Sequence, residues 1–222
     1  MTAPPLIVIC GATATGKTGL AIRLGEWLAG QGRPAEIISA DSRQVFRGLD
    51  IGTAKVTAEE RARVPHHGID LAEPDQPFSV ADFTRHTREI LAELGARDAV
   101  AILAGGTGLY LRAVARGLDA DALPSNPDIR ALLEAQLEAE GLEPLVRRLE
   151  QLAPSQAARV DLRNPRRVVR ALEIAELSGD TGPPAPLGYD GPSAWIGLTV
   201  DTPTHARWIA ERARAQFDAG LV

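Results

Sequence analysis

The chain has 222 residues, of which 45% are hydrophobic, 24% charged and 4% aromatic, and its formal net charge is −5. This is the composition of an ordinary globular protein of one or two domains, and it argues against a disordered or fibrous chain. The net charge and the few aromatic rings argue against a protein that coats nucleic acid non-specifically. The single cysteine cannot form an internal disulfide, and no apolar run approaches the ~20 residues of a membrane span. We therefore expect a cytoplasmic protein without a membrane anchor, and a monomer.

The first segments predict a strand, a loop, a helix and a second strand. Residues 6–10 form a continuous apolar run, which is typical of a strand buried on both faces of a parallel sheet. Residues 17–29 carry apolar side chains at three- and four-residue spacing and predict an amphipathic helix. A second strand is expected over 36–40, and the polar tract 41–44 follows it directly. Because ligands bind at the carboxyl edge of such sheets, this tract is a candidate site.

The strand-loop-helix order then repeats. Residues 50–77 are rich in Gly, Pro and His and predict mostly functional loop, with one short helix over 58–63. A helix is expected over 79–94, where it begins with a capping box. A buried strand over 99–104 leads into the glycine-rich loop 105–108 and a further helix. This order predicts an α/β fold with a doubly wound parallel sheet.

The pattern changes near Gly117, because only helical periodicity follows until a last strand over 195–200 and a final helix. We predict three parts: an α/β core over residues 1–120, a helical insertion over 121–192, and a return to the core over 193–222.

The strongest motif is a phosphate-binding P-loop. The segment after the first strand matches G-x-x-x-x-G-K-[ST] completely, and it follows a strand and opens a helix, as the motif requires. Backbone N–H groups of such a loop wrap an anion, Lys17 adds a positive charge, and the Thr18 hydroxyl can hold Mg²⁺. The motif predicts a P-loop NTPase-like core. The predicted phosphate site consists of Gly11, Ala12, Thr13, Ala14, Thr15, Gly16, Lys17 and Thr18.

The acidic residue that usually completes such a site is missing from its usual place. In most P-loop NTPases a later strand ends in an Asp that helps to hold Mg²⁺, but here the strand over 99–104 runs directly into Gly105. The candidate acid is Asp41, which follows the second strand and should lie beside the P-loop. On spacing alone, Asp41 could instead cap the following turn.

Several segments resemble the tRNA dimethylallyltransferase (tRNA isopentenyltransferase) family. The most specific is SADSRQVFRGLDIGTAK over 39–55. Further matches are VPHH with ID over 64–70, PFSVADF over 77–83, GGTGLY over 105–110 and NPRRVVRALE over 164–173. The resemblance spans nearly the whole chain.

The resemblance implies transfer of a dimethylallyl group from dimethylallyl diphosphate to N6 of the adenosine just 3′ of the anticodon, in tRNAs that read codons beginning with U. Asp41 matches the family's base, which takes a proton from the weakly nucleophilic adenine amine. The P-loop would hold the leaving diphosphate, together with Mg²⁺ on Thr18 and with Arg212, which matches a family arginine at that diphosphate. The implied catalytic residues are Asp41, Thr18 and Arg212.

The resemblance also implies contacts to the tRNA anticodon stem-loop. The enzyme would flip the target adenosine into a channel. The dense arginine cluster over 163–170 would face the tRNA backbone. The implied tRNA-binding residues are Asp41, Ser42, Arg43, Gln44, Thr107, Arg130, Arg166, Arg167, Val168, Val169 and Arg170.

Two departures from the family pattern stand out. Trp208 lies where the family usually has an arginine, four residues before Arg212. The family also normally continues well beyond this length, so we expect the chain to lack its C-terminal segment and the core to be truncated.

Two other functions fit parts of the sequence. A small-molecule or nucleoside kinase would use the P-loop for ATP and Asp41 as base for a substrate hydroxyl, although no arginine-rich lid loop is evident. A non-catalytic tRNA-binding remnant would bind the stem-loop without turnover. His66 and His67 lack partners at metal-ligand spacing and indicate loop packing. The arginine cluster alone could be a solvated helix face.

Overall fold

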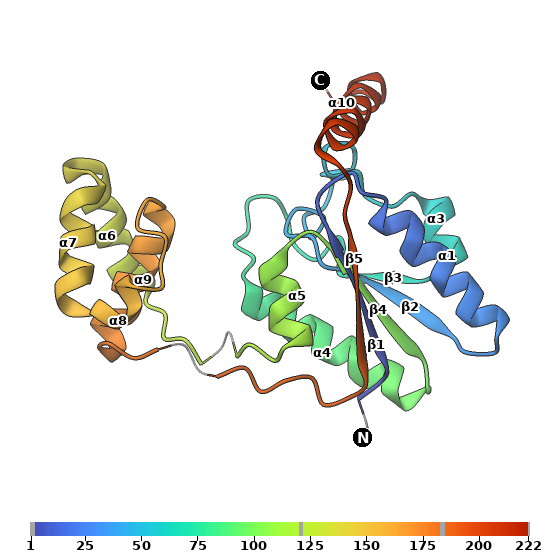
Figure 1. The fold of residues 1–222 in the computed structure, drawn as a ribbon, viewed down its shortest axis with the longest axis horizontal. Coiled ribbons are helices and arrows are strands. Elements are labelled where there is room, and N and C mark those ends of the chain that lie inside the picture. Colours follow the sequence, from blue (N-terminus) through green and yellow to red (C-terminus); the bar gives the residue numbers. More distant parts are fainter. Residues whose placement is uncertain (1–2, 120–121, 183–184, 222) are drawn as a thin grey trace. The chain divides into compact units, whose positions relative to one another are not determined.

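The computed structural model describes residues 3–119, 122–182 and 185–221. The chain divides into two compact units (Figure 1). The core unit consists of Met1–Leu118 and Pro186–Val222, and the helical unit consists of Asp119–Ala185.

The chain rejoins the core unit earlier than the sequence indicated. The N–H groups of Leu187 and Gly188 donate to the carbonyls of Gly117 and Arg116. The Tyr189 hydroxyl donates to a carbonyl near the N-terminus over 2.7 Å. These bonds attach residues 187–189 to the core unit before β5 begins, within the range that the sequence assigned to the helical insertion.

A parallel sheet forms the centre of the core unit. In the described part of the chain it has five strands in the order β3-β2-β4-β1-β5. Their bounds are β1 Leu6–Gly11, β2 Ala35–Ser39, β3 His66–His67, β4 Val100–Gly105 and β5 Ser193–Leu198. Every residue of β2 and β4 is buried, as expected for strands covered on both faces. The predicted α/β class with a parallel sheet is confirmed.

Helices cover both faces of this sheet (Figure 1). Side chains alternate along each strand, so neighbouring residues such as Val8 and Ile9 belong to two different hydrophobic clusters. One face packs against α4 and α5, and the other packs against α1. The core-unit helices are α1 Lys17–Gly30, α2 Asp50–Thr53, α3 Ala58–Arg63, α4 Val80–Ala96, α5 Gly108–Ala115 and α10 Thr202–Asp218.

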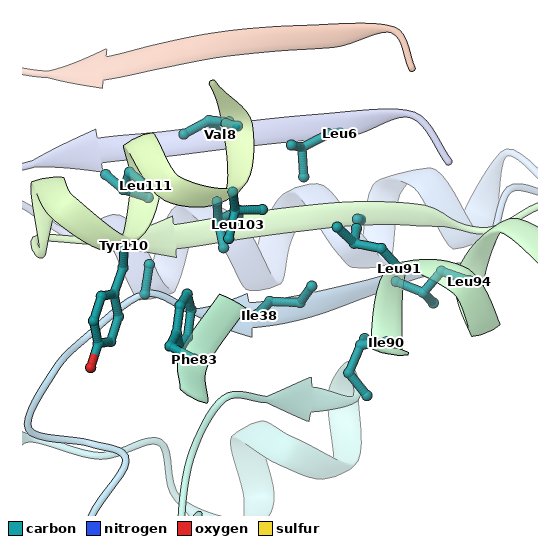
Figure 2. Packing of buried hydrophobic residues seen from close by; sticks show 14 of the residues in the cluster. Leu6, Val8, Ile38, Phe83, Ile90, Leu91, Leu94, Leu103, Tyr110 and Leu111 are labelled. Atoms are coloured by element: carbon teal, nitrogen blue, oxygen red, sulfur yellow. The ribbon is translucent and has the colours of Figure 1, made fainter. Parts of the chain in front are cut away.

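Figure 2 shows the cluster on the α4 and α5 face. Phe83 of α4 stacks on Tyr110 of α5 with ring centroids 4.1 Å apart. Burial, and then the nearby charge of Asp41, raise the pKa of Tyr110 to about 12, so this phenol is neutral at ordinary pH. The charge effect of Asp41 on Tyr110 places the start of α5 near the Asp41 turn.

The helical unit has its own hydrophobic core, which includes Leu133, Leu145 and Leu149. Its helices are α6 Pro127–Glu140, α7 Leu142–Leu152, α8 Pro154–Ala157 and α9 Pro165–Ser178. Both α6 and α9 begin with an Asn cap followed by Pro, a strong helix start signal.

The last helix of the core unit differs from α1, α4 and α5, which all bury residues against the sheet. None of the described residues of α10 is buried, and Trp208, Ile209 and Phe217 are exposed. The structure contains no helix, among the residues it describes, that is long and apolar enough to cross a membrane.

Candidate active site

A cavity of about 850 Å³ lies at the carboxyl ends of β1, β2 and β4. The P-loop forms one wall, the Asp41 turn and the end of α2 form another, and one face of α10 contributes Trp208, Glu211, Arg212 and Ala215. All of these segments belong to the core unit. Seven residues of the P-loop motif therefore meet Asp41, Gln44 and Arg212, which the strand-end rule and the resemblance singled out, around one space.

The P-loop has the backbone that its glycines require. Gly16 has φ of 82° and precedes α1, a conformation that strongly favours glycine. Seven of the eight motif residues line the cavity, whereas the Thr15 hydroxyl turns back and donates to the carbonyl of Ala12 over 2.8 Å. Lys17 Nζ donates to the same carbonyl over 2.6 Å. Burial lowers the pKa of Lys17, and Arg212 lowers it further, while Asp41 opposes the shift.

Thr18 lies in the first turn of α1 and lines the cavity. No cluster of three His, Cys, Asp or Glu side chains suited to a metal occurs among the described residues. Mg²⁺ commonly keeps several waters and binds through few protein groups together with substrate phosphates. A threonine hydroxyl in a phosphate-binding cavity fits that mode, so these residues suit a cation that arrives with its phosphate ligand.

Asp41 is half-buried and lines the cavity. Its Oδ1 accepts from the N–H groups of Arg43 (2.8 Å) and Gln44 (3.4 Å), so the capping role considered as an alternative is present. Among the described residues, Oδ2 has no hydrogen-bond partner. The cap therefore orients the carboxylate and leaves one oxygen available to a ligand.

The Asp41 turn is joined to the glycine-rich loop after β4. The N–H of Ser42 donates to Thr107 Oγ1 over 3.0 Å, and the N–H of Thr107 donates to the carbonyl of Ala40 over 3.1 Å. A Cβ at Gly105 would lie 2.1 Å from that carbonyl, so only glycine permits this approach. The structure thus brings Ser42 and Thr107 together, as the resemblance implied, although neither lines the cavity.

Gln44 lies in the cavity wall with only 9% of its surface exposed. Its Oε1 accepts from Ser39 Oγ over 2.8 Å, and its Nε2 donates to the carbonyls of Thr53 (3.2 Å) and Ala54 (3.3 Å). Both amide hydrogens are therefore used within the protein. The neighbouring Arg43 side chain is exposed.

The same face of α10 contacts the P-loop. Arg212 Nη1 donates to Thr13 Oγ1 over 2.8 Å, and Nη2 donates to the carbonyl of Thr53 over 3.1 Å. His205, two turns earlier, contacts the carbonyl of Thr13 through Nε2 at 2.9 Å. Sequence reasoning found Arg212 but missed His205 and Thr53. The sequence signal that could have identified His205 is its seven-residue spacing from Arg212, which puts both residues on one helix face.

In the helical unit, Arg130 and Arg170 belong to an internal network. Glu173 is fully buried, and it accepts from Arg130 Nε (3.0 Å) and from the N–H of Asn126 (2.8 Å). Arg170 Nη1 lies 2.7 Å from the same carboxylate. Burial alone would raise the pKa of Glu173, but these hydrogen bonds outweigh burial and hold the pKa below its ordinary value.

The remaining residues of the predicted tRNA-binding set in α9 are either exposed or buried. Arg166 and Arg167 are exposed in the first turn of α9, and the structure shows no ion pair to either within its described ranges. The side chains of Val168 and Val169 are 0% and 3% exposed and lie in the hydrophobic core of the helical unit. These two side chains pack in the core, as their apolar spacing with Leu172 indicates, so a tRNA contact at these positions would use the backbone, and their place in the tRNA-binding set stays a prediction.

The chain matches known proteins over nearly its whole length. The family model described as IPP transferase matches residues 44–222. The chain belongs to the IPP transferase family. It is 44% identical over 220 residues to the tRNA dimethylallyltransferase of Bifidobacterium longum, covering 98% of this chain and 66% of that protein. It is 45% identical over 219 residues to the tRNA dimethylallyltransferase of Thermus thermophilus, covering 97% of this chain and 69% of that protein.

Solved structures agree with this IPP transferase assignment. The full-length tRNA isopentenylpyrophosphate transferase of Bacillus halodurans matches with a TM-score of 0.64 and 39% identity, over 98% of this chain and 67% of that one. A eukaryotic dimethylallyltransferase described as acting on tRNA matches with a TM-score of 0.73 and 22% identity, which shows the fold alone. The predicted P-loop NTPase-like fold is confirmed. This IPP transferase chain spans about two thirds of the length of the curated relatives it matches.

Proposed function

We propose that the protein transfers a dimethylallyl group from dimethylallyl diphosphate to N6 of the adenosine 3′-adjacent to the anticodon, in tRNAs that read U-initial codons. It would do so as a cytoplasmic monomer. One observation carries the proposal: a single cavity is lined by the P-loop, by Arg212 and by Asp41, one of whose carboxylate oxygens has no partner among the described residues. The named relatives supply the acceptor and donor classes, because they are tRNA dimethylallyltransferases.

The diphosphate fits the P-loop side of the cavity. Lys17, Lys55 and Arg212 line the cavity, and because Lys55 is already paired with Asp50 and Asp70, Lys17 and Arg212 are the cations open to a diphosphate. The start of α1, where backbone N–H groups favour an anion, lies in the same wall. Glu60 and Glu211 also line the cavity, so its side chains alone do not neutralise a diphosphate. Mg²⁺ held through the Thr18 hydroxyl would supply the missing positive charge when bound.

Asp41 fits the role of general base. As N6 of adenine forms a bond to the allylic carbon, the bond from that carbon to the diphosphate oxygen breaks. Asp41 Oδ2 takes the N6 proton, and Lys17 and Arg212 stabilise the charge on the departing diphosphate. The hydrogen bonds to Oδ1 hold the carboxylate in one orientation while Oδ2 reacts. Charge and atoms balance without another reactant.

The helical unit would contact the tRNA backbone through Arg166 and Arg167, whose side chains are exposed on α9. Arginine side chains at such sites bind phosphate oxygens and fix orientation. Arg130 and Arg170 would act indirectly, because both are held by Glu173 inside the unit.

The test is direct. The purified protein is incubated with Mg²⁺, dimethylallyl diphosphate and an unmodified anticodon stem-loop with three adenosines after the wobble position, and the digest is searched for N6-dimethylallyladenosine by mass spectrometry. We expect product from the parent and from Asp75→Asn, which changes an exposed acid outside the cavity. Asp41→Asn should abolish it.

The alternatives give different results. A kinase would turn over ATP with a small acceptor and ignore dimethylallyl diphosphate. A non-catalytic binding protein would retain the stem-loop without forming product. Either outcome would refute the proposed transfer.

A further inference from the structure

A buried ammonium group lies within the loop that follows the Asp41 turn. The side chain of Lys55 is 1% exposed. Its Nζ donates to the carbonyl of Phe46 (2.9 Å), to Asp50 Oδ1 (2.6 Å) and to Asp70 Oδ1 (2.7 Å). An ammonium group has three donors, so this geometry uses all of them. Because a buried charge is stable only when it is paired, these contacts hold Lys55 in place.

The two carboxylates belong to different segments. Asp50 begins α2, whereas Asp70 lies after β3 with φ of 57° and also accepts from Arg61 Nη2 over 3.0 Å. Burial opposes ionisation, but the bonds from Lys55 and Arg61 keep the pKa of Asp70 below its ordinary value. The N–H of Asp70 donates to the carbonyl of Gln44 over 3.1 Å. Lys55 therefore ties α2 to the segment that carries Gln44.

The end of α2 links Lys55 to two residues of the cavity wall, Gln44 and Arg212. The carbonyl of Thr53 accepts from both Gln44 Nε2 and Arg212 Nη2, and the carbonyl of Ala54 accepts the second Gln44 bond. Lys55 follows these two carbonyls directly in the chain. The position of this short segment therefore determines where the Gln44 amide and the Arg212 guanidinium lie.

We propose that Lys55 is a positioning residue for diphosphate binding. Its three bonds hold the carbonyls of Thr53 and Ala54, and the first of these holds Arg212 against the P-loop. The effect of Lys55 on diphosphate binding rests on the proposed function. Its effect on how firmly the segment with Thr53 and Ala54 is held does not. Lys55 lines the same cavity, but protein oxygens occupy all three of its donors, so it would act by holding this segment and not by donating to the ligand.

The first test is a double-mutant cycle on the binding of inorganic diphosphate with Mg²⁺, measured by calorimetry. We expect Lys55→Met to weaken binding about 10-fold, the change expected when a charge-assisted hydrogen bond is lost. In an Arg212→Ala background the same change should have an effect of less than about 2-fold, because the residue it positions is gone. Equal effects in both backgrounds would overturn the inference. Arg63→Met, which removes an exposed cation paired with Glu26, is the control and should leave binding unchanged.

The second test needs no ligand. Amide hydrogen exchange of the free protein should become faster over residues 44–55 and 205–216 in Lys55→Met, and should stay unchanged in the helical unit. Asp50→Asn is a milder variant, because its side chain is 66% exposed and Lys55 keeps Asp70. It should show the same pattern to a smaller extent. Unchanged exchange in both variants would overturn the inference, whereas a parent protein that binds no diphosphate would overturn only the proposed function.

Discussion

Replacing Glu173 by Gln should destabilise the helical unit alone. Glu173 is fully buried and accepts hydrogen bonds from Arg130, Arg170 and the N–H of Asn126. Gln keeps the size of the side chain and can still accept from Asn126, but it removes the negative charge that both guanidinium groups require. Two cations would then face each other without an anion between them.

The magnitude follows from the exposure of the partners. Breaking a buried ion pair by removing one partner costs about 3–5 kcal/mol. The side chains of Arg130 and Arg170 are 40% and 33% exposed, so water compensates for part of the loss. We therefore expect the free energy of unfolding of the helical unit to fall by about 2–3 kcal/mol, at or below the lower bound of that range.

The assay can separate the two units because Trp27, Trp195 and Trp208, the three tryptophans of the chain, lie in the core unit. Urea unfolding followed by tryptophan fluorescence should be unchanged in Glu173→Gln. Hydrogen exchange of α6, α7 and α9 should become faster. Glu143→Gln, which removes an exposed partner of Arg147 on α7, is the matched control and should cost less than about 0.5 kcal/mol.

The contribution of Glu173 to the stability of the helical unit should fall in acid. The pKa of Glu173 is lowered in the folded unit, so its contribution is complete above the pKa of an unfolded glutamate and is lost as the pH falls through the folded pKa. The parent helical unit should therefore lose stability in acid more steeply than Glu173→Gln. Equal exchange rates in α6 and α9 for the two proteins at neutral pH would refute the reasoning.

Three further predictions concern the site and the tRNA. Gly105→Ala would put a Cβ 2.1 Å from the carbonyl of Ala40, so we expect a loss of about 3 kcal/mol or more in the urea unfolding of the core unit, together with reduced product formation. Thr18→Ala should weaken diphosphate binding in the presence of Mg²⁺ but not in its absence, by calorimetry; equal loss in both would contradict a metal role. Arg166→Glu and Arg167→Glu should leave unfolding unchanged but weaken stem-loop binding, measured by filter binding. Each should lower the magnitude of the slope of log affinity against log salt concentration by about one, the loss of one phosphate contact, and an unaltered slope would exclude that contact.

Much of the fold follows from local signals in the sequence. The strands β1 and β4 are continuous apolar runs, β2 is a short strand around Ile37 and Ile38, and the helix predicted over 58–63 has these same bounds in the structure. Strand β3 was missed because it has only two residues, both His, and exists through its pairing with β2. The last strand was expected at 195–200 but is Ser193–Leu198, since its register is set by pairing with β1.

The site was predictable where strand ends and motifs define it. The meeting of Asp41 with the P-loop follows from the rule that parallel strands end at one edge of a sheet. The use of Gln44 inside the protein could not be foreseen, because its partners are backbone carbonyls at Thr53 and Ala54 whose position depends on the folded loop. The contact of His205 likewise depends on where α10 docks.

The way α10 is bonded to the core unit affects which substitutions its contact surface tolerates. Among the described residues, its side-chain bonds to the rest of the core unit go to the backbone carbonyls of Thr13, Ile51, Gly52 and Thr53, apart from one bond to the hydroxyl of Thr13. A backbone carbonyl is present whatever side chain the residue carries. The surface that binds this helix therefore depends mainly on the backbone conformation of these segments. Substitutions that preserve this conformation can accumulate there without weakening the bonds that hold α10 in the cavity wall.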